Sequence, residues 1–362
     1  MGIASLFMPA VMGIIADRWI PAQRLLGLCH LFAAGFITLA ATRTDYNSLY
    51  TLVLLSVMFY MPTIALSNSV AYNALEKAGL DTVTHFPPIR VWGTVGFICA
   101  MWVVDLGKMG LSATQLYFSA TLGLILGLYS FTLPNCPINR SGGGKSIVDL
   151  LGLRAFALFK QRKMAIFFIF SMLLGMSLQI TNAFADGYIK SFGDTGIHGA
   201  KYLGTFGVEH STILISLSQI SETLCILLIP FFLKRFGIKR VMLIAMFAWV
   251  LRFALLGAGN PGPGVWMFIL SMIVYGVAFD FFNISGSLFV EKETSAATRS
   301  SAQGVFMIMT NGLGALIGSY LAGWVVNHYG WPLSWYLFAG FSLVVAIVFA
   351  VIFKYKHDPN RI

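Results

Sequence analysis

Charged residues are scarce in this chain. Of its 362 residues, only 10% are Asp, Glu, Lys or Arg, whereas 57% are hydrophobic, and the mean hydropathy is +0.79. Soluble domains carry about 25% charged residues, so the composition excludes an ordinary soluble fold. It predicts an all-α polytopic membrane protein, one that crosses the bilayer several times.

The sequence motifs of common enzymes and metal sites are also missing. The four cysteines stand singly, without a CxxC pair, and the six histidines show no metal-ligand spacing. Neither HExxH nor GxSxG occurs, so the marks of zinc peptidases and serine hydrolases are absent. We therefore expect a protein that is not an enzyme and that holds no metal or organic cofactor.

Long apolar runs are what the chain has in abundance. A helix needs about 20 mostly apolar residues to span a bilayer. By this criterion eleven segments qualify: Met1–Ala16, Leu25–Thr42, Ser48–Ala74, Val91–Leu106, Gln115–Leu133, Met164–Ala185, Thr212–Leu233, Val241–Gly257, Gly264–Val290, Ser301–Val326 and Pro332–Phe353.

The longest connection divides these segments into five before it and six after it. We predict an N-terminal helix bundle over 1–133, a cytoplasmic central loop over 134–163 and a C-terminal six-helix bundle over 164–362. Short basic turns at Gly13–Arg24 and Phe232–Arg240 occupy matching places only if the first half lacks its first helix. Repeated six-helix halves are typical of transporters, so the sequence predicts eleven of an expected twelve helices.

Positive charge gathers on alternate connections. If the central loop is cytoplasmic, 19 of the 24 Lys and Arg residues lie on that side, four lie on the other and Arg252 falls within a segment. The positive-inside rule then places the central loop and the C-terminus in the cytoplasm. We expect Arg252 to snorkel towards the interface or to form a structural pair.

One polar face stands out in the first half. In the stretch from Phe86 to Phe97, two prolines lead into an apolar helix, with Arg90 at or just inside its start. Arg90, Thr94 and Phe97 follow one another at i, i+4 and i+7, so they share one helical face. An arginine facing hydrocarbon is costly, so this face is a candidate wall of a polar ligand site.

Polar residues in the second half also recur at helical spacing. The pairs are Gln179 with Asn182, Gln219 with Glu222, and Tyr275 with Phe279, the last followed by Asp280 and Asn283. Amides and carboxyls suit the hydroxyls of a ribose, and aromatic rings suit a flat base. Each amide alone is equally well explained as a bond between helices, but intramembrane carboxylates are functional by default.

Several stretches of the chain resemble those of known transporters. The turn Gly13–Arg24 is similar to the loop between the second and third helices of the major facilitator superfamily. Longer stretches resemble the bacterial nucleoside:proton symporters: Phe86–Thr94, Ala157–Lys160, Met164–Gly175, Leu178–Asn182, Ser218–Thr223, Phe279–Ser287 and Phe289–Glu293. The resemblance covers essentially the whole chain, except that family members carry a complete first helix before the sequence equivalent to Met1.

The resemblance implies a major facilitator fold of two pseudo-symmetric bundles and a multi-pass protein of the bacterial inner membrane. It implies that matched positions line the nucleoside site: Arg90, Thr94, Phe97, Gln179, Asn182, Gln219, Glu222, Tyr275 and Phe279. Asp280 and Glu222 are the candidates for proton coupling, and Asp280 is favoured because Glu222 shares a polar face with Gln219. The expected partners are a nucleoside, protons and the bilayer, with no nucleic acid, and we expect a monomer.

Two other functions stay open at this point. The same fold could carry another polar solute such as a sugar, which would use the aromatic faces less. The chain could also be a membrane receptor that binds a ligand without transporting it. Competition between nucleosides and sugars, and flux measured against binding, distinguish these alternatives.

Overall fold

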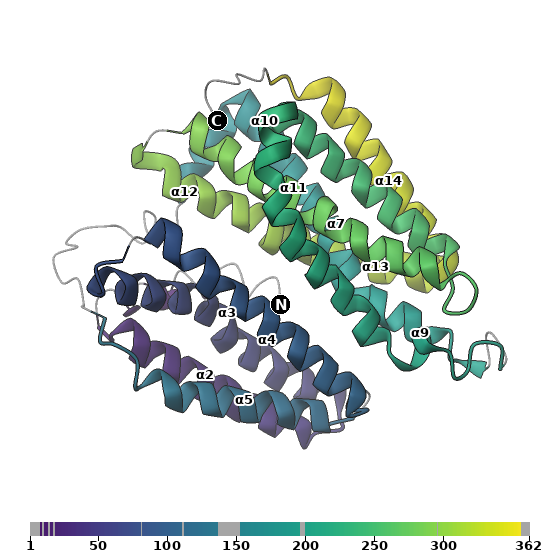
Figure 1. Cartoon of the computed structure of the whole chain (residues 1–362), viewed down its shortest axis with the longest axis horizontal. Coiled ribbons are helices and arrows are strands. Elements are labelled where there is room, and N and C mark those ends of the chain that lie inside the picture. The colour runs from purple at the N-terminus through teal and green to yellow at the C-terminus, as the bar shows by residue number, and fades with distance from the viewer. Residues whose placement is uncertain are drawn as a thin grey trace. The chain divides into compact units, whose positions relative to one another are not determined.

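The computed structural model describes residues 8, 11–13, 15–16, 19–80, 82–110, 112–136, 153–195, 200–294 and 296–355. Helices dominate these residues, and no strand occurs among them. The chain forms two compact units, one of residues 1–97 and 106–151 and one of residues 98–105 and 152–362. Figure 1 labels the helices of both.

Seven of the described helices are long and apolar enough to cross a membrane. They lie at Ala22–Ala41, Tyr46–Lys77, Arg162–Ser191, Ser211–Ala258, Val265–Val290, Ala302–Tyr329 and Trp331–Ile352, and Val91–Leu106 forms a shorter apolar helix. The all-helical membrane fold predicted from composition is therefore confirmed. The predicted segment Met1–Ala16 lies largely outside the described residues.

The first unit contains α2 (Ala22–Ala41), α3 (Tyr46–Lys77) and α5 (Thr114–Ser130). Helix α2 packs against both α3 and α5. Its contact with α5 is close because two glycines meet: a Cβ on Gly27 would lie 2.9 Å from the Gly127 carbonyl oxygen. Small residues allow this approach between membrane helices.

Helix α4 (Thr82–Leu106) begins earlier than the sequence suggested. Arg90 was expected at the start of the helix, but eight helical residues precede it. A proline fixes φ near a helical value, and a membrane bundle tolerates the hydrogen bond that a proline removes. The two prolines therefore do not mark the helix boundary.

The second unit holds the remaining helices. They are η1 (Leu153–Lys160), α7 (Arg162–Ser191), α9 (Phe206–Glu209), α10 (Ser211–Ala258), α11 (Val265–Glu293), α12 (Ala296–Met307), η2 (Ile308–Gly314), α13 (Ala315–Tyr329) and α14 (Trp331–Ile352). Helix α10 packs most extensively against α11, and then against α14. Helix η1 lies within the predicted central loop.

Helix α10 consists of two legs that double back on each other. Gly237, with φ 76° and ψ 165°, interrupts the helix, in a conformation that glycine adopts without a steric penalty. Ser218 of the first leg and Arg252 of the second both contact the sulfur of Met272, at 3.1 Å and 3.7 Å. A straight helix would hold these two residues about 50 Å apart. The legs match the predicted segments Thr212–Leu233 and Val241–Gly257.

The predicted segment Ser301–Val326 is not one regular helix. It contains the end of α12, the π-helix η2 and most of α13. The widened turn lies where α7 approaches most closely. A Cβ on Gly175 would overlap the Thr310 carbonyl oxygen, and one on Gly314 would lie 2.6 Å from the Met172 carbonyl oxygen. The face of this segment that carries Thr310 and Gly314 therefore packs against α7.

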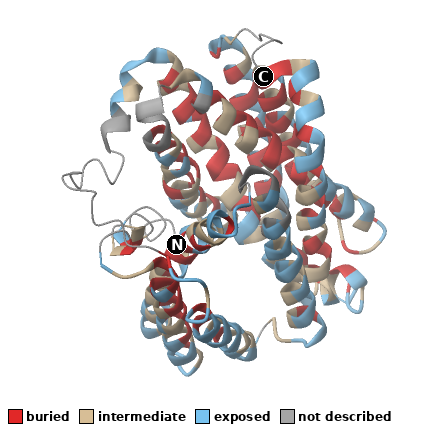
Figure 2. Ribbon diagram, turned by 60° about the vertical axis from the view of Figure 1, so that its left-hand side comes forward, coloured by how far each residue is buried: buried red, intermediate tan, exposed pale blue. Residues whose placement is uncertain are grey.

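The second unit has an aromatic core and an apolar exterior. Aromatic side chains fill its centre, among them Phe167, Trp249, Phe253 and Trp335, each at most 1% exposed. The outward faces of its helices carry exposed apolar residues such as Leu227 and Val351. Figure 2 shows buried segments turned towards the interior of this unit and exposed ones on its outside. An apolar exterior of this kind suits contact with lipid.

Candidate functional site

Tyr275 lies at the centre of a cluster inside the second unit. It is 4% exposed. Its ring stacks on Phe279 one turn further along α11, with centroids 5.9 Å apart and an interplanar angle of 21°. Trp249 of α10 meets the same ring edge-on, at 6.0 Å and 88°. The predicted aromatic pair on α11 is therefore one continuous face.

Arg252 supports this aromatic face from α10. Its guanidinium carbon lies 4.7 Å from the Tyr275 centroid, and its Nη1 donates to the Ser271 carbonyl oxygen. Nε lies 3.4 Å from the Thr181 hydroxyl oxygen of α7. Because Arg252 is only 1% exposed, it does not snorkel, and the structural pair that was the other expectation is what the structure shows. Its neighbours are a ring, a carbonyl and a hydroxyl, which together replace part of its hydration.

The polar end of Tyr275 contacts one candidate site residue and lies near two others. The side chain of Asn182 contacts its hydroxyl group, and the carboxyl groups of Glu222 and Asp280 lie close enough to interact with it electrostatically. Glu222 and Asp280 also interact with each other. Helices α7, α10 and α11 thus bring an amide, two carboxyl groups and a phenol together.

Asp280 is the most enclosed acid of this group. It is 3% exposed, and its Oδ2 has no hydrogen-bond partner among the described residues. Buried polar atoms are nearly always paired, so an unpaired one calls for an explanation. A carboxyl group in such a place is well suited to bind and release a proton during a working cycle.

A pocket adjoins this cluster. It encloses about 310 Å³, part of it open to solvent. Four elements supply its lining: Leu174, Gly175 and Leu178 of α7, Trp249 of α10, Ala278, Phe279, Phe282 and Asn283 of α11, and Thr310 and Asn311 of η2. Phe279 belongs to both the cluster and the pocket, so it joins them.

The other predicted residues are less engaged. Gln179 and Gln219 are half-buried, on the helices that carry Asn182 and Glu222. Thr94 is half-buried and Phe97 is 53% exposed, both on α4 in the first unit. The Arg90 side chain is outside the described part of the chain. The role of the Arg90, Thr94 and Phe97 face stays a prediction.

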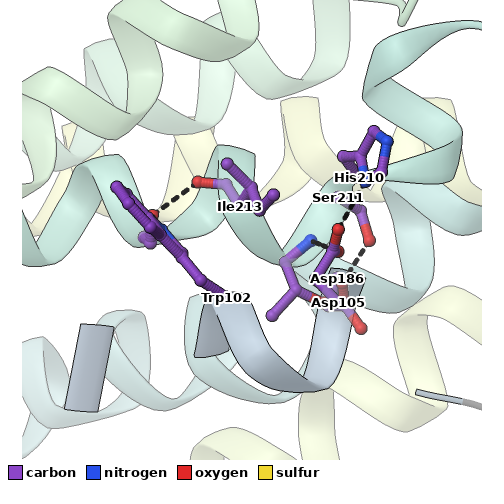
Figure 3. A network of polar contacts seen from close by, with 8 residues as sticks. Trp102, Asp105, Asp186, His210, Ser211 and Ile213 are labelled. Atoms are coloured by element: carbon purple, nitrogen blue, oxygen red, sulfur yellow. Dashed lines mark hydrogen bonds and ion pairs between the residues drawn. The ribbon is translucent and has the colours of Figure 1, made fainter. Parts of the chain in front are cut away.

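A second polar network joins the end of α4 to the start of α10 (Figure 3). Asp105 Oδ2 lies 2.6 Å from His210 Nδ1, and Asp105 Oδ1 accepts from the Thr212 backbone nitrogen at 3.2 Å. One turn earlier on α4, Trp102 Nε1 donates to Ser216 Oγ at 2.8 Å. Asp105 thereby caps a helix whose own N-cap residue, His210, makes no side-chain capping bond.

Asp186 of α7 belongs to the same network. It accepts from Ser211 at 2.6 Å and pairs with Lys190 at 2.7 Å. The sequence reasoning had not singled out Asp105 or His210. An acid near the end of the apolar segment Val91–Leu106 was the available signal, because such residues are costly in a membrane unless they are paired.

The arrangement of apolar helices around the polar cluster at Tyr275 defines a secondary transporter of the major facilitator type. The crystal structure of the nucleoside transporter NupG matches this chain with a TM-score of 0.89 and 51% identity, covering 98% of this chain and 88% of that one. This likeness extends over both units.

Sequence comparison gives the family. The nucleoside permease NupG of Escherichia coli (strain K12) is 51% identical over 99% of this chain and 86% of that protein. The xanthosine permease of the same organism is 50% identical over 100% of this chain and 87% of that protein. The profile of the nucleoside H+ symporter family matches residues 1–358. The chain belongs to this family of proton-coupled nucleoside transporters.

Proposed function

We propose that the chain carries nucleosides across the bacterial cytoplasmic membrane by alternating access around the Tyr275 cluster, as a monomer. The observation that supports this most is that Asn182, Glu222 and Asp280 lie around one buried phenol, that of Tyr275. Ribose hydroxyls both donate and accept hydrogen bonds, as amide, carboxyl and phenol groups do. The central loop and the C-terminus face the cytoplasm in this proposal, because positive charge gathers on that side.

The proposed substrate contacts follow from the chemistry of each side chain. Gln179, Asn182, Gln219 and Glu222 supply amide and carboxyl groups for the ribose, and Tyr275 with Phe279 supplies the aromatic face. Arg90, Thr94 and Phe97 are proposed to contribute from the first half of the transporter. The names of the two permease relatives, for nucleosides and for xanthosine, support a substrate of this class.

Proton coupling is assigned to Asp280. Its enclosed carboxyl group has an unpaired oxygen and a carboxyl neighbour. Burial of an unpaired charge is costly, so an enclosed Asp280 favours the protonated carboxyl group. The arrival or departure of the substrate next to Asp280 can shift the balance between the protonated and the ionised carboxyl group. Glu222 would then bind the nucleoside rather than carry the coupled proton.

Reconstitution in proteoliposomes tests the proposal. Radiolabelled uridine and xanthosine are offered with the outside acidic, and uptake is compared with that in vesicles without a pH gradient. We expect accumulation that needs the gradient and that unlabelled nucleosides inhibit, while a sugar such as maltose does not.

Two outcomes would point to the alternatives. Inhibition by sugars with no effect of nucleosides would indicate a transporter of another polar solute. Nucleoside binding without any flux, in vesicles where a known transporter works, would indicate a receptor.

A further inference from the structure

The pocket beside the Tyr275 cluster has the lining of a site for a flat ring. Three aromatic residues, Trp249, Phe279 and Phe282, line it. Aromatic faces stack on nucleobases with little regard for their identity. The pocket therefore suits the base of a nucleoside, while the polar cluster suits its ribose.

Two amides in this pocket make no hydrogen bond to a nitrogen or oxygen atom of the described residues. Asn283 makes no hydrogen bond to another described residue, and the amide of Asn311 has only a 3.7 Å contact with the sulfur of Met307. Gln303 on α12 is different, because it donates to the Ser287 carbonyl oxygen at 2.7 Å and accepts from the Ser287 hydroxyl at 3.2 Å. Gln303 links helices, whereas Asn283 and Asn311 keep donors and acceptors for a ligand.

The fold explains how Asn311 reaches the pocket. It lies in the middle of the π-helix η2, and π-helical turns occur frequently at functional sites. The neighbouring Thr310 backbone touches Gly175 of α7. Asn283 follows Phe279 by one turn on α11, so it extends the aromatic face with an amide. The two amides therefore flank a common space from different helices.

We propose that this pocket is the base subsite and that Asn283 and Asn311 are specificity-determining residues that read the edge of the base. This inference rests on the proposed function. An amide offers a carbonyl acceptor and two donors, which complement a base edge that presents a carbonyl next to an N–H group. Uracil, hypoxanthine and xanthine have such an edge, whereas cytosine and adenine present a different order of donors and acceptors.

The test compares nucleosides that share the ribose and differ only in the base. Uptake of uridine, cytidine, adenosine, inosine and xanthosine is measured in proteoliposomes at one fixed pH gradient, for wild type, Asn283→Leu and Asn311→Leu. Leaving a polar base edge unpaired costs about 1–3 kcal/mol. We therefore expect the ratios of kcat/KM between nucleosides to change roughly 5- to 160-fold in at least one variant.

Asn311→Asp is a milder probe that keeps size and polarity. It removes the donors and leaves acceptors, so the preference should move towards bases that present donors. Gln303→Leu is the matched control, because its amide is committed to Ser287. It should lower thermal stability without changing the ratios.

The outcomes separate this inference from the proposed function. Wild-type uptake of nucleosides with unchanged ratios in both asparagine variants would overturn the base subsite alone. Uniform loss of every nucleoside in Asn311→Asp would also count against it, because base reading requires unequal losses. A wild-type protein that moves no nucleoside at all would overturn both proposals.

Discussion

The guanidinium group of Arg252 lies over the ring of Tyr275, with 4.7 Å between its carbon and the ring centroid. The same side chain is almost completely enclosed and bonds to the backbone of α11. Arg252 therefore fixes the position and tilt of the Tyr275 ring, whose hydroxyl group is proposed to contact the nucleoside.

Arg252→Lys should raise the KM for nucleoside about tenfold with a smaller change in the maximal rate. Lysine keeps the charge but loses the planar face and the multiple donors, and a desolvated cation–π contact is worth about 2 kcal/mol. Kinetics of uptake measure this, with the exposed Arg240→Lys as control. In a Tyr275→Leu background the effect of Arg252→Lys should largely vanish. A lysine variant with wild-type KM would show that the stacked geometry is not needed.

Asp280→Asn should lose accumulation driven by a pH gradient while keeping equilibrium binding and exchange of nucleoside. The amide cannot take up a proton, but it preserves the size of the side chain. Glu222→Gln should lose binding and accumulation together, because its carboxyl group is proposed to hold the substrate. The two variants are compared by uphill uptake and by binding to purified protein. Normal accumulation by Asp280→Asn would remove it as the coupling residue.

Arg90→Ala should lose most nucleoside binding, and Arg90→Lys should restore little of it. A planar fork of donors can hold two acceptors at once, which an ammonium group cannot do with the same geometry. Binding of labelled uridine to purified protein measures this. If the lysine variant binds like wild type, Arg90 serves as an interface anchor rather than a ligand.

Much of this fold could be predicted from apolar runs alone, because a long run such as Pro332–Phe353 has few alternatives to a membrane helix. Local irregularities could not be predicted in this way. The two prolines predict a helix start near Arg90, whereas α4 begins at Thr82, and the π-helix at Ile308–Gly314 depends on the approach of α7. Hydropathy carries no information about such contacts between helices.

For the candidate site, too, relations within one helix could be predicted, whereas contacts between helices could not. Helical spacing places Gln219 beside Glu222 and Tyr275 beside Phe279, since one helix determines each pair. It does not reveal that Arg252 faces Tyr275, because that contact joins α10 to α11. The cost of a buried charge predicts either snorkelling or a structural pair for Arg252, and the enclosing ring and carbonyl group, which offset that cost, decide for the pair.

Asp105→Ala should lower the thermal stability of the purified protein in detergent more than Asp105→Asn does. The carboxyl group of Asp105 accepts from the Thr212 backbone nitrogen and meets His210. Asparagine can keep the capping bond, which is worth about 1 kcal/mol, whereas alanine loses both contacts. Glu209→Ala is the matched control, since Glu209 is an exposed acid next to the same helix start. Equal melting temperatures for wild type and Asp105→Ala would contradict the cap.

Gly175→Ala should destabilise the protein and reduce nucleoside uptake, whereas Gly187→Ala on the same helix should do neither. A Cβ at Gly175 would overlap the Thr310 carbonyl oxygen, but one at Gly187 would meet no atom within 4 Å. Replacing an unhindered helical glycine by alanine stabilises by about 0.5–1 kcal/mol, and forcing extra volume into a packed contact costs about 1–3 kcal/mol. The two substitutions are chemically identical, so their difference isolates the contact between α7 and η2. Because that contact holds one wall of the pocket, the loss of uptake should exceed the loss of folded protein. Melting curves and initial uptake rates per folded transporter measure both quantities, and a Gly175→Ala protein that matches Gly187→Ala in both would show that α7 and η2 are not in close contact.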